Sequence, residues 1–511
     1  MFIHLTTAQE VDSACRRITE LLSSYLEWFC TQNKTEAYAL RRNEIDIAVL
    51  QERLIFSCWT EKGNKSWRVH GWQWDGQALT LQASRRMGAE KPLIELVPRA
   101  SAKVIAATIN AARQVRCYKL AEVAAAIQPE TRIERCDLSP GIRRGQPGRY
   151  ARIILRRKQI RIAVTASVVK SHPGSIDAFL SAGLLWFKRT SERIKQPYIE
   201  RLWLVVSKDS ARGVMTRIAL LRSSLRNLIT LFTVDDDLSS LEEVELLEQG
   251  ELWKQRVARL PPVPGGNPSR QILQIIEEAP EAIDVVHARH GETLRYFGLP
   301  FARVRTLLGE EKIWFGTDRE HRKLLDVSTV DDWRNLLSDL TIYRAADAMD
   351  HRHSLYRSAA EAWLESLLRK DITRLDPGLI IAPLHAQFRT ARGGKLGVRP
   401  IDMLALRQDG RLVVIELKVA EDREHVLQGA DYWRRVEAHR RRGDIAKAKL
   451  FGDREIRNES PLVYLVAPTL RVHPSFQTLA DSIDEEIEIY RFDINEDWRT
   501  GVRVMRRLKA N

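Results

Sequence analysis

Two charged side chains stand in an otherwise apolar stretch near the C-terminal end of the sequence. The run Leu412–Val419 is almost continuously apolar, which is typical of a strand covered on both faces, yet it contains Glu416 and Lys418. Because side chains two residues apart leave the same face of a strand, these two lie side by side. A charge in such a strand costs several kcal/mol unless it is paired or binds a metal. The placement indicates either a structural ion pair or a site with a chemical role.

Asp402 adds a second carboxylate to this pair. It lies in the apolar run 400–406, and a turn at 408–410 separates that run from the strand of Glu416. Antiparallel pairing across such a turn brings Asp402 beside Glu416. Two carboxylates and an ammonium group make a site of hard oxygen ligands for Mg²⁺ or Mn²⁺, with Lys418 left to handle negative charge.

The order Asp, an intervening turn and then Glu-x-Lys resembles the PD-(D/E)XK nuclease superfamily. The first half of that motif is degenerate, because Ile401 stands between Pro400 and Asp402. A helix expected at 422–442 carries Gln428 and Tyr432, which share one face because they are four residues apart. This Gln-x-x-x-Tyr after Glu-x-Lys resembles the RecB-type branch of the superfamily.

A third carboxylate is expected on the helix that precedes these strands, at 357–370. Its Glu361 and Glu365 flank an apolar stripe and resemble the first helix of nucleases of the NucS type, in which the first Glu faces the metal. The resemblance therefore gives this role to Glu361, with Glu365 as the alternative. A solvated helix face is the other interpretation of both residues.

The resemblance implies a fold and a set of functional residues. The fold is a restriction-endonuclease-like core in the order helix, three strands, helix, strand, with Mg²⁺ (or Mn²⁺) as cofactor. The implied catalytic residues are Asp402, Glu416, Lys418 and Glu361, the implied metal ligands are Asp402, Glu416 and Glu361, and the implied substrate-binding residues are Gln428, Tyr432, Arg434 and Arg435.

Composition favours a polyanionic partner. The formal net charge is +14, so we expect nucleic acid, and DNA in the first place. No apolar run approaches the length of a membrane span, so no membrane partner is expected. The five cysteines are odd in number and form no C-x-x-C, which fits a reducing cytoplasm.

Three possibilities stay open at this point. One is a Mg-dependent deoxyribonuclease, for which we expect an endonuclease acting in repair or defence. The second is a catalytically inactive nucleic-acid-binding scaffold of the same fold. The third is a protein that does not act on nucleic acid, in which Glu416 and Lys418 form a structural ion pair. The complete set of Asp, Glu and Lys favours the enzyme, because a binding module has no need to keep charges buried in a strand.

The length of 511 residues predicts roughly three domains, in a multidomain α/β protein. We expect an α/β module at 1–120, a second at 121–260, a Pro- and Gly-rich linker at 261–268, a lead-in subdomain at 269–349 and the nuclease-like domain at 350–511. The first two modules offer surfaces for protein partners. The second repeats the order hairpin, helix, strand without an Asp or Glu-x-Lys at the matching place, so any kinship would make it a degenerate copy.

Overall fold

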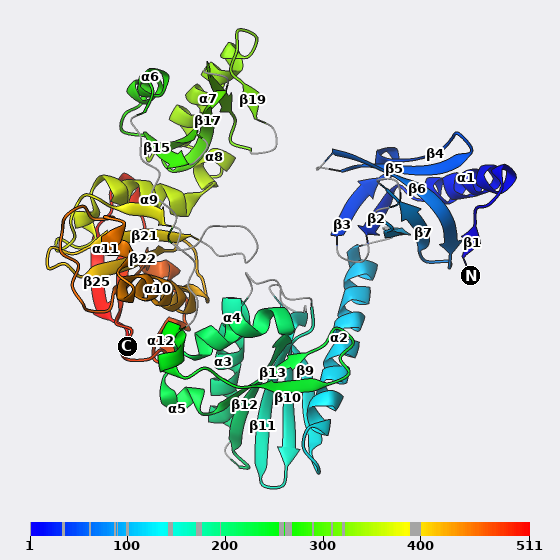
Figure 1. The fold of residues 1–511 in the computed structure, drawn as a ribbon, viewed down its shortest axis with the longest axis horizontal. Helices are drawn as coiled ribbons and strands as arrows, with labels where there is room; N and C mark the ends of the chain where they lie inside the picture. Colours follow the sequence, from blue (N-terminus) through cyan, green and yellow to red (C-terminus); the bar gives the residue numbers. More distant parts are fainter. Residues whose placement is uncertain are drawn as a thin grey trace. The chain divides into compact units, whose positions relative to one another are not determined.

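The protein is described by a computed structural model that divides into two compact units, Met1–Val115 and Arg116–Asn511. Each unit is described by itself (Figure 1). The structure describes residues 2–511 except 33–35, 61–62, 86–87, 89, 99–101, 142–146, 170–175, 195, 255–259, 261–267, 289–290, 308–309, 319–321 and 389–399. Apart from Pro268, the expected linker at 261–268 lies outside the described residues. Among the described helices, none has the length and apolar character that crossing a membrane requires.

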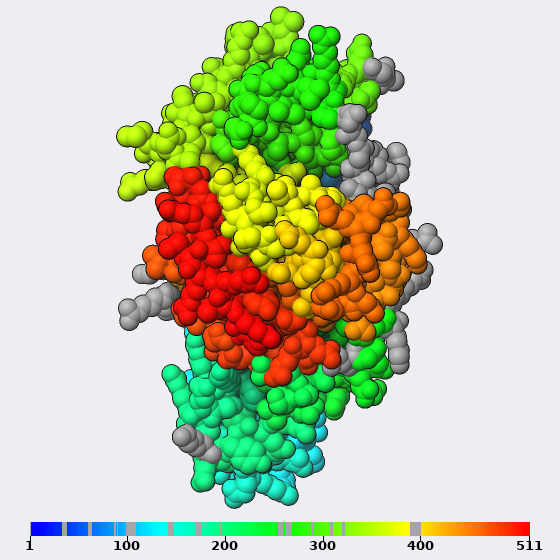
Figure 2. Space-filling model, turned by 90° about the vertical axis from the view of Figure 1, so that its left-hand side faces the viewer, coloured from blue at the N-terminus to red at the C-terminus, as the bar shows by residue number. Residues whose placement is uncertain are grey.

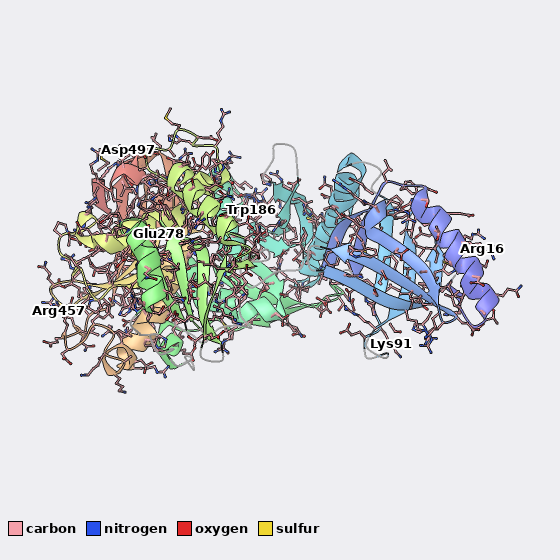
Figure 3. All side chains as sticks on the ribbon, turned by 90° about the horizontal axis from the view of Figure 1, so that it is seen from above. Arg16, Lys91, Trp186, Glu278, Arg457 and Asp497 are labelled. Atoms are coloured by element: carbon pink, nitrogen blue, oxygen red, sulfur yellow. The ribbon has the colours of Figure 1, made fainter. Side chains whose placement is uncertain are left out.

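The first unit is an antiparallel sheet with one helix packed on it. The strand order is β3-β2-β8-β7-β6-β5-β4, and β1 pairs with β6. The elements are β1 (Ile3–His4), α1 (Ala8–Ser23), β2 (Glu27–Gln32), β3 (Glu36–Arg41), β4 (Ile45–Leu50), β5 (Arg53–Thr60), β6 (Gly63–Trp74), β7 (Leu79–Ser84) and β8 (Leu93–Pro98). Helix α1 starts at a capping box formed by Thr7 and Glu10. Arg16 of α1 and Lys91 before β8 are exposed (Figure 3).

The second unit contains three sheets, so the chain is a mixed α/β protein with several sheets. Helix α2 (Ala102–Ala126) begins in the first range and ends in the second. The sheet that follows has the order β14-β13-β12-β11-β10-β9. Its elements are β9 (Arg132–Pro140), β10 (Pro147–Arg157), β11 (Ile160–Ser167), α3 (Ile176–Arg193), β12 (Ile199–Ser207), α4 (Lys208–Ile218), α5 (Ser223–Arg226), β13 (Ile229–Val234) and β14 (Leu241–Val244).

A five-stranded antiparallel sheet with the order β15-β16-β17-β18-β19 follows. Its elements are α6 (Arg270–Glu278), β15 (Ile283–Ala288), β16 (Gly291–Tyr296), β17 (Leu299–Leu307), β18 (Glu310–Phe315), β19 (Lys323–Leu324), α7 (Val330–Tyr343) and α8 (Ser354–Arg357). The turn between β16 and β17 packs on helix α9 (Ala360–Lys370), where Phe297 stacks on Trp363 with ring centroids 5.2 Å apart. Gly298 adopts a positive φ of 77° there, and a Cβ on it would meet the carbonyl of Ala362.

The last sheet has the order β20-β21-β22-β23-β24-β25. Its elements are α9 (Ala360–Lys370), β20 (His385–Phe388), β21 (Ile401–Leu406), β22 (Leu412–Leu417), α10 (His425–Arg441), α11 (Asp444–Lys447), β23 (Leu462–Pro468), α12 (Phe476–Ala480), β24 (Ile489–Ile494) and β25 (Val504–Lys509). Trp363 of α9 meets Trp498 edge-on, with ring centroids 6.3 Å apart. The segments that carry them, yellow and red, adjoin in Figure 2.

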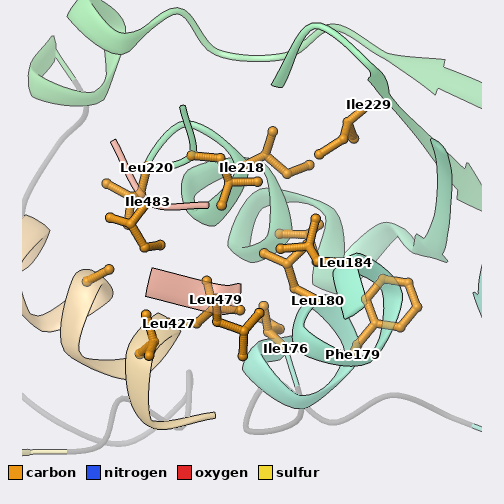
Figure 4. Packing of buried hydrophobic residues seen from close by; sticks show 14 of the residues in the cluster. Ile176, Phe179, Leu180, Leu184, Ile218, Leu220, Ile229, Leu427, Leu479 and Ile483 are labelled. Carbon is orange, nitrogen blue, oxygen red and sulfur yellow. The ribbon is translucent and has the colours of Figure 1, made fainter. Parts of the chain in front are cut away.

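One hydrophobic core joins the first and last of these three sheets (Figure 4). Helices α3 and α4 contribute Leu180 and Ile218, while α10 and α12 contribute Leu427 and Leu479. A short antiparallel bridge pairs Leu221 with Ile483 beside this core. Buried apolar contact of this kind fixes the two sheets to each other within the second unit.

Candidate functional site

Asp402, Glu416 and Lys418 come together where β21 and β22 part. The antiparallel ladder runs from Leu406–Leu412 to Met403–Ile415 and is not continued to Asp402 and Glu416. Instead, the backbone N–H of Leu417 donates to Oδ2 of Asp402 at 2.9 Å. The carboxylate of Asp402 thus replaces a backbone partner and is held beside Glu416.

Glu416 and Lys418 leave the same face of β22, as their spacing predicts. Nζ of Lys418 donates to Oε1 of Glu416 at 2.7 Å, and the two residues are 7% and 1% exposed. Oε2 of Glu416 is buried and has no hydrogen-bond partner among the described residues. A buried acceptor without a partner is costly, so this oxygen is suited to receive a ligand.

The electrostatics of the pair follow from burial and from Asp402. Burial and the neighbouring charge of Asp402 raise the pKa of Glu416 well above its ordinary value, although Lys418 opposes the shift. Burial also raises the pKa of Asp402. Burial alone would lower the pKa of Lys418, but the charges of Glu416 and Glu361 outweigh it and raise that pKa, so Lys418 stays protonated.

A pocket of about 460 Å³ opens over these groups. Six residues predicted for the site line it, namely Glu361, Asp402, Glu416, Lys418, Gln428 and Tyr432, and the alternative Glu365 lines it as well. Nε2 of Gln428 donates to the hydroxyl of Tyr432 at 2.8 Å, and Oε1 of Gln428 is buried without a partner among the described residues. The structure therefore gathers six of the predicted residues around one cavity.

The third carboxylate is less closely placed than the first two. Glu361 is about half exposed, and its Oε1 lies 4.0 Å from Nζ of Lys418. Glu365, the alternative, is buried and accepts from Nη1 of Arg295 at 3.1 Å and from Nε2 of Gln387 at 2.7 Å. Within the described part of the chain, no group of three or more His, Cys, Asp and Glu side chains is placed to hold a metal ion.

Arg434 and Arg435 are not brought to the pocket. Nη2 of Arg434 lies 2.6 Å from Oδ1 of Asp431, and Nε of Arg435 lies 3.3 Å from Oδ2 of the same residue. Arg217 of α4 lies 3.0 Å from Asp431 as well. This cationic cluster lowers the pKa of Asp431 although burial opposes the shift. The two arginines thus take part in a buried network between α10 and α4.

Two residues of the site carried no signal in the sequence. Gln387 has a left-handed backbone with a φ of 49° and stands on β20 between the ladder pairs Ala386–Met403 and Phe388–Ile401, which places it opposite Asp402. His425 lies on α10, and its Nε2 is 3.2 Å from the carbonyl oxygen of Glu416. Burial lowers the pKa of His425 to about 4, so a neutral ring donates to that carbonyl.

Comparisons with known proteins give only distant likenesses. The sequence matches no family profile and no curated protein. A solved structure of EndoMS in complex with double-stranded DNA is 11% identical with a TM-score of 0.16, over 46% of this chain and 96% of that chain. Pelota from Archaeoglobus fulgidus is 10% identical with a TM-score of 0.10, over 55% of this chain and 65% of that chain. At such scores the chemistry of the site has to be argued from its own residues.

Proposed function

We propose that this protein is a metal-dependent nuclease, with a restriction-endonuclease-like catalytic domain at 350–511 and residues 269–349 as its lead-in subdomain. One observation carries the proposal: Asp402 and Glu416 oppose each other at the parting of two strands, and Oε2 of Glu416 has no donor among the described residues. A structural ion pair would need only Lys418, and it would not need a second acid that raises the pKa of the first.

The donor set fits Mg²⁺ or Mn²⁺. These ions bind to oxygen, and Mg²⁺ commonly uses one or two protein carboxylates and keeps several waters. Asp402 and Glu416 would hold the ion, and Glu361, whose half-exposed carboxylate lies 4.0 Å from Nζ of Lys418 in the same pocket, would contribute through water. A bound divalent cation supplies charge stabilisation at the phosphate and a more acidic water.

The other residues of the pocket have roles that their contacts support. Lys418 is held protonated by Glu416, so it can orient an attacking water or balance charge that develops on the phosphate. Gln428 and Tyr432 form a buried hydrogen-bonded pair that lines the same cavity. The amide oxygen of Gln428 has no hydrogen-bond partner among the described residues. They would position a backbone group of the substrate or a water of the site.

Nucleic acid is the substrate class, with DNA the first candidate. A phosphodiester requires a site that neutralises negative charge, and the net charge of +14 on the chain supports its capture. The alternative of an inactive scaffold predicts binding without turnover.

The test is to incubate the protein with circular and linear, single- and double-stranded DNA, with Mg²⁺, with Mn²⁺ and with chelator. We expect metal-dependent cleavage by the wild-type protein. Asp402→Asn and Glu416→Gln should each reduce the rate by at least about a hundredfold, because each removes one ligand charge, while DNA affinity stays near the wild-type value. Cleavage at the wild-type rate by both variants would defeat the proposal, and metal-independent binding without cleavage would favour the scaffold.

A further inference from the structure

Two sheets of the second unit share one topology. In β9–β14 and in β20–β25, the first three strands are antiparallel, the third to fifth are parallel, and the sixth is antiparallel to the fifth. In both, a helix precedes the first strand, a second helix joins the third strand to the fourth, and a third helix joins the fourth to the fifth. These helices are α2, α3 and α4 in the first case and α9, α10 and α12 in the second.

The helix that follows the third strand fixes the correspondence between the two sheets. A Cβ added to Gly183 of α3 would lie 3.3 Å from Cδ2 of Leu204, and one added to Gly429 of α10 would lie 2.6 Å from Cδ2 of Leu465. The fourth and fifth strands also begin to pair in the same way. The backbone N–H of Leu202 donates to the carbonyl of Leu228, which precedes β13, and the N–H of Val463 donates to the carbonyl of Glu488, which precedes β24. Leu204 and Leu465 are therefore equivalent.

The strand pairings carry this equivalence into the site. Thr165 pairs with Leu204 as Glu416 pairs with Leu465, so Thr165 occupies the position of Glu416. Arg152 pairs with Thr165 across the hairpin, which is the position of Asp402 relative to Glu416. Two residues beyond Thr165, a serine replaces Lys418.

The helix completes the match. Trp186 comes three residues after Gly183, as Tyr432 comes three residues after Gly429. The guanidinium of Arg152 lies 5.8 Å from the ring centroid of Trp186. The positions of Asp402, Glu416 and Tyr432 in the C-terminal sheet thus correspond to those of Arg152, Thr165 and Trp186 in the other sheet.

Arg152, Thr165 and Trp186, which we call the second site, have the chemistry to bind an anion. Among the described residues, no carboxylate lies within salt-bridge distance of the partly buried Arg152. Thr165 is 1% exposed, and its hydroxyl has no partner in the described part of the chain. Burial and the charges of Arg189 and Arg423 lower the pKa of Arg152 to about 10, with Asp137 acting in the opposite sense. A phosphate oxygen would satisfy both the guanidinium and the hydroxyl.

A hydrogen bond connects the segment of the metal-site candidate to helix α3. The hydroxyl of Ser181 on α3 donates to the carbonyl of Arg423 at 3.4 Å. Arg423 stands in the segment that joins Lys418 to α10, so this segment begins at the metal-site candidate and contacts the helix that carries Trp186 of the second site. The bridge between Leu221 and Ile483 links the equivalent turns after α4 and α12, which is the arrangement of an approximate two-fold axis.

We propose that α2 to β14 form a second copy of the C-terminal fold, in which the second site, with Arg152 and Thr165, binds a phosphodiester of the nucleic acid without cleaving it. The choice of nucleic acid as the source of that phosphate rests on the proposed function. The preference of the second site for a phosphate does not, because this site has a cation and a hydroxyl donor where the other has two acids.

The test measures DNA binding by the full-length Asp402→Asn protein, because this variant is expected to bind DNA without cleaving it. Fluorescence anisotropy with a labelled duplex gives Kd over a range of salt. Adding Arg152→Ala should weaken binding about tenfold, as expected for one charge-assisted contact, and should reduce the slope of log K against log salt by about 0.9, the value for one phosphate. Arg152→Lys keeps the charge and should retain most of the slope.

Arg156→Ala is the matched control, because Arg156 is an exposed arginine on the same strand, four residues closer to the hairpin tip. It should bind as the parent does. If Arg152→Ala melts early, Arg152→Gln replaces it, since glutamine keeps a polar stem beside Trp186. Unchanged affinity and slope on loss of the Arg152 charge would overturn the proposal, and so would equal weakening by the two alanine variants. A wild-type protein that binds but never cleaves would defeat the proposed function and leave this inference standing.

Discussion

Glu416 is the residue on which the charge balance of the site depends. Its raised pKa means that the folded protein keeps a proton that the unfolded chain has already lost. Below the ordinary value of 4.5 both states are protonated and the shift has no effect. As pH rises from there through the raised pKa, the folded state loses stability relative to the unfolded chain, and above that pKa the full loss is present.

In metal-free protein Glu416 should therefore contribute a fall in melting temperature as pH rises above about 4.5, and Glu416→Gln should remove this contribution. Asp402 and Glu365, whose pKa values are also raised, act in the same direction. His425, whose pKa burial lowers to about 4, acts in the opposite direction up to its ordinary pKa of 6.5. The measurement is thermal unfolding in chelator across this range. Exchange of the exposed Glu455 for Gln serves as the control and should leave the curve unchanged. Equal slopes for wild type and Glu416→Gln would contradict the assignment.

Lys418 separates a structural pair from a site that binds metal. In a structural pair, removal of the lysine leaves a buried carboxylate uncompensated, at a cost of about 3–5 kcal/mol. In the proposed site the cation takes over most of this compensation. Lys418→Met should then be folded, should gain thermal stability from Mg²⁺ or Mn²⁺ according to the ligand concentration, and should lose cleavage. Melting curves with and without metal, beside a cleavage assay, decide between the two; a folded, metal-insensitive variant that still cuts would refute both.

Residue types and period-two spacing were sufficient to predict that Asp402, Glu416 and Lys418 share one point, because both relations are local. The partner of Glu365 was not predictable in this way. Arg295 stands 70 residues earlier in the chain, on a sheet that packs against α9 only in the folded protein. Gln387 was missed for a related reason, since its place opposite Asp402 depends on strand pairing and on an unusual backbone angle.

At the level of elements, the equivalent glycines of α3 and α10 allow a paired experiment. Gly to Ala within a helix gains up to about 1 kcal/mol when space permits. Space is lacking at Gly429, where a Cβ would lie 2.6 Å from Leu465 and 3.1 Å from Val463, and overpacking costs about 1–3 kcal/mol. At Gly183 the nearest atom is at 3.3 Å.

We therefore expect Gly429→Ala to lower the melting temperature and Gly183→Ala to leave it unchanged or raise it. Thermal unfolding of the two variants beside wild type is the measurement. Equal melting temperatures for all three proteins would contradict the close approach of α10 to its sheet at Gly429.

The elements around the site were predictable from apolar periodicity and turn residues, because the apolar runs 400–406 and 412–419 contain the strands found at Ile401–Leu406 and Leu412–Leu417. Strand β25 (Val504–Lys509) escaped prediction because an edge strand with the sequence VMRRLK lacks the apolar pattern of a buried one. Helix α2 buries Leu120, Ala121 and Ala124 of its last turns against the second sheet, a contact that depends on the folded chain.

On the scale of the whole molecule, the proposed combination of one cleaving site with one non-cleaving site predicts a cut in one strand at a time. A duplex bound at both sites would meet the carboxylates of Asp402 and Glu416 at one and the guanidinium of Arg152 at the other. Supercoiled plasmid should accordingly be converted to open circles first, and linear DNA should form only later, from independent second cuts. Agarose electrophoresis of a time course, with Asp402→Asn as the blank, follows the products. Linear DNA that appears together with the first open circles would refute one-strand cleavage.

The relation between the two sheets lay beyond sequence analysis for a specific reason. The order hairpin, helix, strand was visible in both, but a comparison that looks for acids finds none at 152 and 165. Only the pairings of Thr165 with Leu204 and of Arg152 with Thr165 identify those positions. The sequence alone does not identify these positions because no acid stands there, whereas the strand register does.

The bridge between Leu221 and Ile483 has the form of a contact across a two-fold axis. A homodimer forms such a contact when a residue meets the same residue of its mate, and here both residues belong to one polypeptide. In a homodimer every substitution appears twice, so neither partner can give up catalysis alone. Within one polypeptide the two halves are encoded by different codons, so Asp402 can stand in one half while Arg152 stands at the equivalent position of the other.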